Sequence, residues 1–350
     1  MRLVDDATLE AVYQRDVRHA LFKNTRSSSQ PRLVIVGGQP RAGKTRNILR
    51  ARRELAAAGD GVAFINGDEL RNYHPLYDQL VLADAATAAD KTGADVGWWV
   101  EKGIREAADS RFHTVIETTM RQPAVVARTV NTFAARGFQI EMRVLVVDPE
   151  LSRQAIYNRY ADALNNKNSL PRFTLPRYHD DALAQMPHTL AAITPLVHLV
   201  RLVDRQGAEL YASDKSNQAP AAALQRLRGQ PLPAAELARI GQEWGRLALV
   251  LDRDGISDIV RVGVRQEQQH FTHRGLLQTG SGDLRRPRAG LDDGERAVAN
   301  HRRRSVAAWQ RLFEHPDVRG DAVRWRCRTL PAHHAGTTPA WSSMTKRRAL

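Results

Sequence analysis

The chain contains a single cysteine, Cys327, so it can form neither an intrachain disulfide nor a zinc site built from cysteines. It has no apolar run approaching the ~18 residues that a transmembrane helix requires. The first residues, MRLVDDATLEAVYQRD, carry acids and no apolar segment, so no secretory signal is expected. These absences predict a protein that folds in the reducing cytoplasm, and they fit an effector sent into another cell equally well.

Acidic residues are also comparatively few: 38 Asp and Glu accompany 52 Lys and Arg, which gives a formal net charge of +14. The excess is densest in residues 241–350, where 20 basic residues accompany 12 acidic ones. Runs such as HRRRS and TKRRAL could bind nucleic acid, acidic lipid or acidic protein. Because no nucleic-acid-binding signature accompanies them, a solvated basic tail is the preferred interpretation.

The stretch GQPRAGKT lies between an apolar strand and a helix and matches the phosphate-binding pattern G-x-x-x-x-G-K-[ST]. Glycines let backbone amides surround phosphate oxygens, and the helix N-terminus adds positive potential. Lys44 is predicted to reach the β- and γ-phosphates, and Thr45 to offer its hydroxyl to Mg²⁺. The sequence therefore predicts that ATP or GTP binds to Gly38, Gln39, Pro40, Arg41, Ala42, Gly43, Lys44 and Thr45.

Segments with strand character alternate with segments of helical periodicity over the first two thirds of the chain. This alternation predicts an α/β fold of the P-loop NTPase type: a three-layer sandwich whose mostly parallel sheet is flanked by helices. The expected strands are 33–38, 62–67, 112–119, 139–148, 197–204 and 208–213, and the expected helices are 6–23, 45–59, 79–109, 122–137, 149–165 and 179–191.

Three parts are expected: an N-terminal helix and connector at 1–30, a P-loop kinase domain at 31–235, and a basic extension at 236–350 that is partly disordered or helical. Within the extension the sequence predicts one convincing helix, at 294–315. Glycine and proline interrupt the rest of residues 241–350, which are therefore expected to be weakly ordered and dispensable for catalysis.

Three carboxylates lie at or just past the ends of expected strands. Asp68 could accept a proton from a substrate hydroxyl or could cap the next helix, and spacing leaves both open. Glu117 could hold Mg²⁺, its water or substrate, or could form a structural ion pair. Asp148 precedes Pro149 and Glu150, a pattern typical of a helix N-cap rather than of a metal-binding aspartate.

The chain resembles the zeta toxin family over about residues 10–230. The resemblance depends on an ordered set of motifs: GQPRAGKT, INGDELRNYHP, WWVEKGIREAADSRFHTVIETTMR, YNRYADAL, LPRFTLPRYHD and VRLVDRQGAELYAS. Members of this family are P-loop kinases of bacterial toxin–antitoxin systems. They phosphorylate a hydroxyl of UDP-N-acetylglucosamine with ATP or GTP and so starve cell-wall synthesis.

The resemblance implies a role for each matching residue. Asp68 matches the catalytic base, Lys44 the P-loop lysine, and Arg159 and Arg172 the arginines that clamp the phosphates. The residues that match the substrate-binding positions are Glu101, Glu117, Thr119 and Arg121. Thr118 and Met120 depart from the small residues usual there.

The resemblance also implies a partner, an antitoxin lying over the helix at 6–23 and the ATP cleft. The alternative function is a nucleotide-binding module that has lost catalysis and whose basic C-terminus binds nucleic acid or a protein.

Overall fold

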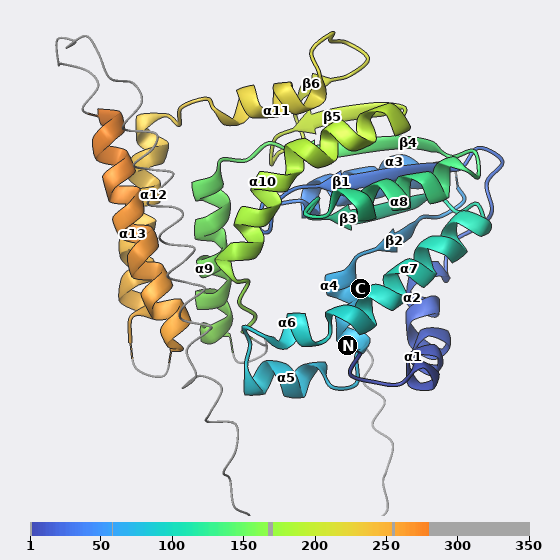
Figure 1. The fold of residues 1–350 in the computed structure, drawn as a ribbon, viewed down its shortest axis with the longest axis horizontal. Coiled ribbons are helices and arrows are strands. Elements are labelled where there is room, and N and C mark those ends of the chain that lie inside the picture. The colour runs from blue at the N-terminus through green and yellow to red at the C-terminus, as the bar shows by residue number, and fades with distance from the viewer. Residues whose placement is uncertain (1, 58, 167–170, 254–255, 280–350) are drawn as a thin grey trace, which may run out of the picture. The chain divides into compact units, whose positions relative to one another are not determined.

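The structure, a computed structural model, describes residues 2–57, 59–166, 171–253 and 256–279. Its centre is a six-stranded sheet in the order β2-β3-β1-β4-β5-β6 (Figure 1). Neighbouring strands are parallel except for β6, which is antiparallel to β5. The predicted fold class is confirmed. The strands are β1 (Arg32–Gly37), β2 (Ala63–Ile65), β3 (Thr114–Thr118), β4 (Gln139–Leu145), β5 (Leu199–Val203) and β6 (Glu209–Ala212).

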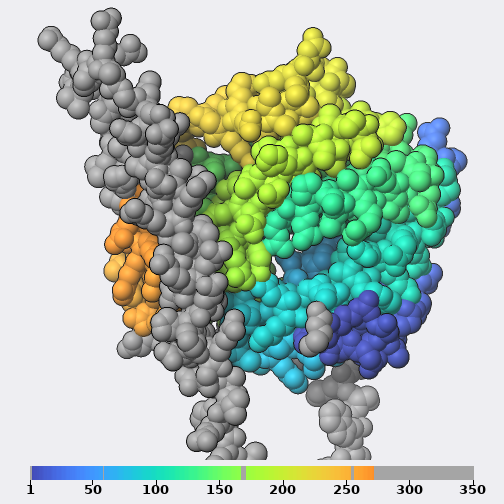
Figure 2. Space-filling model, in the orientation of Figure 1, coloured from blue at the N-terminus to red at the C-terminus, as the bar shows by residue number. Residues whose placement is uncertain are grey.

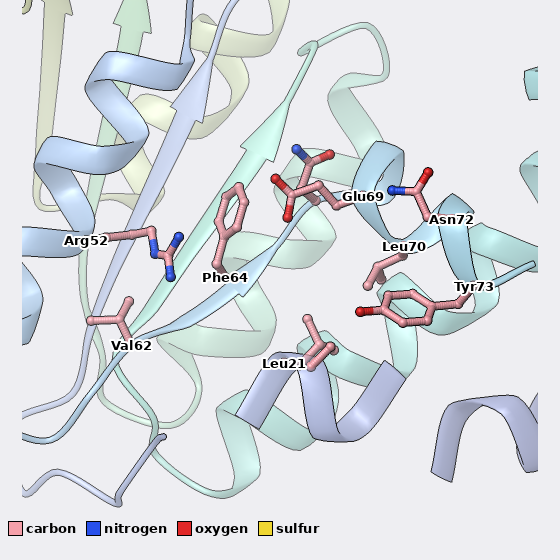
Figure 3. A pocket seen from close by; sticks show the side chains of 10 residues that line it. Leu21, Arg52, Val62, Phe64, Glu69, Leu70, Asn72 and Tyr73 are labelled. Atoms are coloured by element: carbon pink, nitrogen blue, oxygen red, sulfur yellow. The ribbon is translucent and has the colours of Figure 1, made fainter. Parts of the chain in front are cut away.

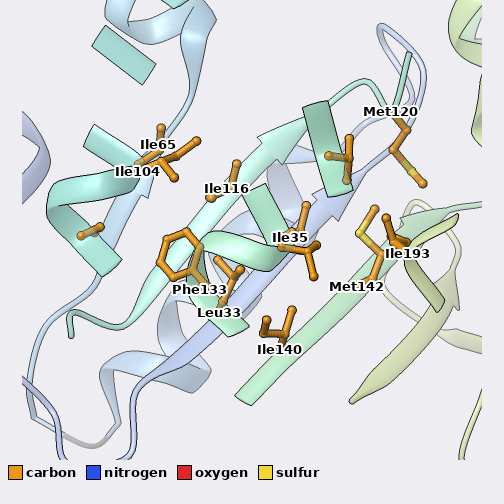
Figure 4. Packing of buried hydrophobic residues seen from close by; sticks show 14 of the residues in the cluster. Leu33, Ile35, Ile65, Ile104, Ile116, Met120, Phe133, Ile140, Met142 and Ile193 are labelled. Carbon is orange, nitrogen blue, oxygen red and sulfur yellow. The ribbon is translucent and has the colours of Figure 1, made fainter. Parts of the chain in front are cut away.

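Helices cover both faces of this sheet. One face buries Val34 and Val36 of β1 against α3, and the other buries Leu33 and Ile35 against α7, α8 and α10 (Figure 4). Successive residues of a strand point to opposite faces, so a continuous apolar run suits a strand that is covered on both sides. The helices of these layers are α3 (Thr45–Ala56), α7 (Gly93–Asp109), α8 (Pro123–Ala134) and α10 (Pro176–Ile193).

The N-terminal helix is confirmed, with one π-helical turn inside it. Its parts are α1 (Asp6–Val12), η1 (Tyr13–Val17) and α2 (Arg18–Phe22). Leu9, Tyr13 and Val17 are fully buried, and the indole Nε1 of Trp99 on α7 donates to the Leu9 carbonyl at 2.9 Å. The helix therefore belongs to the hydrophobic core.

The helical tract expected at 79–109 is divided. It consists of the end of α5 (Tyr77–Ala83), then α6 (Ala88–Lys91) and α7. Asp84 interrupts it in an extended conformation, and its carboxylate accepts a hydrogen bond from the amide of Ala86 at 3.0 Å. Such local side-chain turns compete with helix. Between β2 and α5 lie α4 (Gly67–Leu70) and η2 (Arg71–Tyr73).

Two further helices, α12 (Ala234–Leu251) and α13 (Asp258–Thr279), were not predicted from the sequence. They pack on α9 (Pro149–Asn165) around four aromatic residues, here called the aromatic cluster: Tyr157, Tyr160, Phe173 and Trp244. The ring of Tyr157 lies 5.4 Å from both Phe173 and Trp244. This packing differs from the expectation of a weakly ordered extension. The remaining helices are η3 (Thr194–Leu196) and α11 (Pro220–Arg228).

The helix predicted at 294–315 and most of the basic runs lie outside the described residues. Among the residues that are described, no helix has the length and apolar character needed to cross a membrane.

Glycine in α13 explains why these helices were missed. A Cβ on Gly263 would stand 2.5 Å from the Tyr157 hydroxyl oxygen, so the glycine permits close approach of α13 to α9.

We expect Gly263→Ala to lower the free energy of unfolding by roughly 1–3 kcal/mol, because fully buried Tyr157 cannot move aside freely. In α12 a Cβ on Gly245 meets nothing within 4 Å, so Gly245→Ala should stabilise the chain by roughly 0.5–1 kcal/mol. Urea unfolding of both variants checks this, and equal effects would contradict it.

Candidate functional site

The phosphate-binding loop follows β1 and leads into α3, as predicted. Gly43 has a φ of 89° and Arg41 a φ of 62°, so the loop twice adopts the left-handed conformation that curls its backbone. The Lys44 ammonium is buried and donates to the carbonyls of Gly38 at 2.9 Å and Gln39 at 3.1 Å. The lysine is therefore held across the loop.

Gln39 anchors this loop to the rest of the protein. Its fully buried side chain donates to the carbonyl of Val147 and to Oγ of Ser152, both at 3.1 Å. Its amide oxygen accepts a hydrogen bond from Arg228 at 3.2 Å. Because these bonds occupy the side chain, only the backbone of Gln39 is available to a phosphate.

A polar chain connects Lys44 to the end of β2. The Glu117 carboxylate lies 3.3 Å from the Lys44 ammonium and accepts a hydrogen bond from Asn66 Nδ2 at 2.7 Å. Glu117 stands opposite Val36 in the pairing of β3 with β1, so the sheet register brings it to the loop. The two interpretations of Glu117, as a residue of the site and as a member of an ion pair, are compatible, because its ion-pair partner is the P-loop lysine itself. Asn66 was not singled out from the sequence.

Asn66 also settles the alternative left open for Asp68. The cap of α4 is Asn66, whose side-chain oxygen accepts from the Asp68 amide at 2.8 Å. The capping interpretation of Asp68 is therefore wrong. The Asp68 side chain is 74% exposed and pairs with Arg71 at 2.5 Å. Asp148, in contrast, caps α9 as predicted and accepts from the Glu150 amide at 2.8 Å.

Arginines surround the loop and the segment of Asp68. Burial lowers the pKa of the Arg41 guanidinium, and the charges of Arg159 and Arg205 lower it further. Arg205 donates to the Ala42 carbonyl at 3.2 Å. Arg172 donates to Asn72 just after Asp68, at 2.5 Å. Arg205 follows β5 within the motif VRLVDRQGAELYAS, but the sequence analysis assigned it no role.

A cavity of about 350 Å³ lies beside Ile35 of β1 and the end of β3, between α7 and α8. Two predicted substrate residues, Glu101 and Glu117, line it, and Glu101 pairs with Arg128 at 2.8 Å. The space-filling view shows that the surface is hollowed beside α7 and α8 (Figure 2). Residues that the sequence analysis did not predict also line the cavity, among them Arg105, Thr118, Arg128, Thr129 and Thr132.

Thr119 and Arg121 were predicted for the same site but do not line this cavity. Arg121 instead lies over the ring of Tyr178, with its Cζ 4.5 Å from the ring centroid. Met120 is fully buried with a φ of 57°, and its sulfur would clash with any Cβ on Gly37. Of the two departures from the family pattern, only Thr118 therefore faces the cavity.

A second cavity, of about 320 Å³, lies beside β2 (Figure 3). It is lined by Ala20, Leu21, Arg52, Val62, Phe64, Asn66, Glu69, Leu70, Asn72 and Tyr73. Burial raises the pKa of the Glu69 carboxyl, and the charge of Glu117 raises it further. Asn66 is shared between this cavity and the polar chain from Lys44.

Within the described part of the chain, no group of three or more His, Cys, Asp or Glu side chains could hold a metal ion. Thr45 is exposed at the first turn of α3, directly after Lys44. Mg²⁺ usually takes one or two protein oxygens and completes its shell with phosphate oxygens and waters. The Thr45 hydroxyl fits that requirement.

Comparison with known proteins gives a match to the zeta toxin family over residues 18–216. Toxin PezT of Streptococcus pneumoniae is 25% identical over 221 residues, covering 61% of this chain and 86% of that protein. Toxin zeta of Enterococcus hirae is 26% identical over 220 residues, covering 62% of this chain and 76% of that protein.

Solved structures show the same fold. A chain from the PezAT chromosomal toxin–antitoxin system of Streptococcus pneumoniae superposes with a TM-score of 0.61 at 21% identity. The superposition covers 72% of this chain and 100% of that chain, so the shared fold extends well beyond the P-loop.

Proposed function

This chain belongs to the zeta toxin family of ATP-dependent, kinase-like toxins, and on that basis we propose that it phosphorylates a hydroxyl of UDP-N-acetylglucosamine or a similar nucleotide metabolite. ATP, or GTP, is the proposed donor and is bound with Mg²⁺. The observation that carries the proposal is the polar chain Lys44–Glu117–Asn66, because it joins the phosphate loop to the cavity.

Each residue has a proposed part in the transfer. Lys44 neutralises the β- and γ-phosphates, and Thr45 supplies one oxygen to Mg²⁺. Asp68 takes the proton from the attacking hydroxyl, which raises the nucleophilicity of its oxygen. Arg159 and Arg172 stabilise charge on the transferred group. The planar guanidinium group suits this role because it loses little conformational entropy when it pairs with phosphate oxygens.

The acceptor is proposed to occupy the cavity of Glu101 and Glu117, with its hydroxyl toward Asp68. Glutamates suit sugar hydroxyls because a carboxylate accepts strong hydrogen bonds from them. Thr119 and Arg121 remain proposed substrate contacts, at the end of the site nearer α10.

The proposal is tested by incubating the protein with labelled ATP, Mg²⁺ and UDP-N-acetylglucosamine, or with a metabolite extract, followed by mass spectrometry. We expect one phosphorylated acceptor, and its loss in Lys44→Ala, because alanine cannot neutralise the phosphates.

Expression in bacteria should arrest growth, and Lys44→Ala should relieve the arrest. If wild-type protein binds ATP but phosphorylates nothing, the chain is a binding module and the proposal fails.

An antitoxin is proposed as the partner, because the matched structure belongs to a toxin–antitoxin system. It is proposed to cover the N-terminal helix and the ATP cleft. Leu9, Tyr13 and Val17 of that helix are fully buried. Substitutions of its exposed residues therefore probe the contact better than deletion, which would remove part of the core.

A further inference from the structure

Tyr77 begins α5 and is nearly buried, with an exposure of 3%. Two arginines lie against its ring. The Cζ of Arg172 is 4.9 Å from the ring centroid and that of Arg71 is 5.9 Å from it. Both distances fall within the roughly 6 Å over which an aromatic ring attracts a guanidinium group.

These two arginines serve opposite sides of the proposed reaction. Arg71 pairs with the proposed base Asp68 at 2.5 Å. It also donates through Nε to the Thr92 hydroxyl at 3.1 Å, and its side chain is only 14% exposed. Arg172 is proposed to stabilise charge on the transferred phosphoryl group. The ring of Tyr77 therefore contacts both the arginine that pairs with the proposed base and the arginine proposed to act on the phosphoryl group.

The phenol of Tyr77 remains protonated in this environment. Burial raises its pKa, although the nearby charges of Arg172, Arg71 and Arg159 act in the opposite direction. The arginines therefore meet a neutral aromatic face. Phenylalanine would offer the same face, whereas leucine fills similar space without the ring quadrupole.

We propose that Tyr77 is a positioning residue that aligns the two sides of the reaction. Its ring holds Arg172 at the transferred phosphoryl group and, through Arg71, holds Asp68 at the acceptor hydroxyl. The inference rests on the proposed function. It predicts an effect on the chemical step rather than on ATP binding, because the phosphate loop does not depend on this ring.

The test uses the full chain with Tyr77→Leu, Tyr77→Phe and the control Tyr73→Leu, a neighbouring tyrosine that is 38% exposed. We measure kcat for acceptor phosphorylation, acceptor-free ATP hydrolysis, ATP affinity and thermal stability. Tyr77→Leu should lower kcat and acceptor-free hydrolysis by about tenfold, with ATP affinity within about threefold of wild type. Tyr77→Phe and Tyr73→Leu should stay within about twofold.

A double substitution tests the route of the effect. In the Arg172→Ala background, Tyr77→Leu should lower the rate of acceptor-free ATP hydrolysis by much less than tenfold. The reason is that Tyr77 acts on this hydrolysis through Arg172, whose side chain is already absent. Full additivity overturns the inference, as does a Tyr77→Phe defect equal to that of Tyr77→Leu. Equal losses of kcat, ATP affinity and stability would show a merely structural role and overturn it too. ATP hydrolysis without acceptor phosphorylation would overturn only the proposed acceptor, whereas no turnover at all would overturn the proposed function and this inference together.

Discussion

Replacing Asp68 with asparagine should lower acceptor-dependent turnover by about 10²–10⁴-fold. Asparagine keeps the size of the side chain but cannot accept a proton. ATP affinity should remain near that of wild type, because Asp68 pairs with Arg71 rather than with the phosphate loop. The fold should also survive, since the Asp68 side chain is 74% exposed and Asn66 supplies the cap of α4. Steady-state kinetics, ATP titration and thermal unfolding measure the three quantities.

A matched control is Asp214→Asn, which neutralises an exposed carboxylate just after β6. It should leave turnover, affinity and stability unchanged. If Asp68→Asn stays within a few-fold of wild-type turnover, Asp68 is not the base. Glu69, whose carboxyl has a raised pKa, would then be the next residue to test.

The second large effect is expected at Trp244. Its side chain is fully buried and its ring lies 5.4 Å from that of Tyr157. Trp244→Ala should lower the free energy of unfolding by about 3–5 kcal/mol, through lost burial and the cavity left behind. Turnover should fall as well, because Tyr160 and Phe173 of the same aromatic cluster directly follow the proposed clamp residues Arg159 and Arg172 in the sequence. Urea unfolding and kinetics below the unfolding transition separate the two effects.

Leu249 provides the control on the same helix, since it is 84% exposed. Leu249→Ala should change the free energy of unfolding by no more than about 0.5 kcal/mol. Truncation at residue 240 removes α13 and most of α12 and should abolish turnover. A folded truncation with full turnover would contradict this and would restore the expectation that residues 241–350 are dispensable.

Features determined by neighbours in sequence were predictable. The P-loop pattern needs a strand, a glycine-rich turn and a helix in direct succession, and all three lie within residues 32–56. The helix N-cap at Asp148 likewise depends only on residues close in sequence, because the Asp148 carboxylate accepts a hydrogen bond from the Glu150 amide. Alternating strand and helix patterns determined the parallel sheet, since each apolar run must be buried on two faces.

The C-terminal helices show where sequence reasoning failed. Glycines in α12 and α13 weaken the helical pattern, but Gly263 is needed for close packing against Tyr157. A glycine that breaks a helix and one that admits a neighbouring helix look alike in sequence. Only the packing partner, on α9, distinguishes them.

The site itself was determined by contacts between distant segments. In the sequence, nothing distinguishes Asn66 from other polar residues. In the structure, the pairing of β2 with β3 places Glu117 beside it. Arg172 and Tyr77 come together only because the sheet brings the segments after β2 and before α10 to the same edge. The sequence thus determined which chemical groups the chain carries and the local turns that present them. Their pairing was decided by the tertiary structure, because cation–π contacts and ion pairs depend on distances that no local pattern encodes.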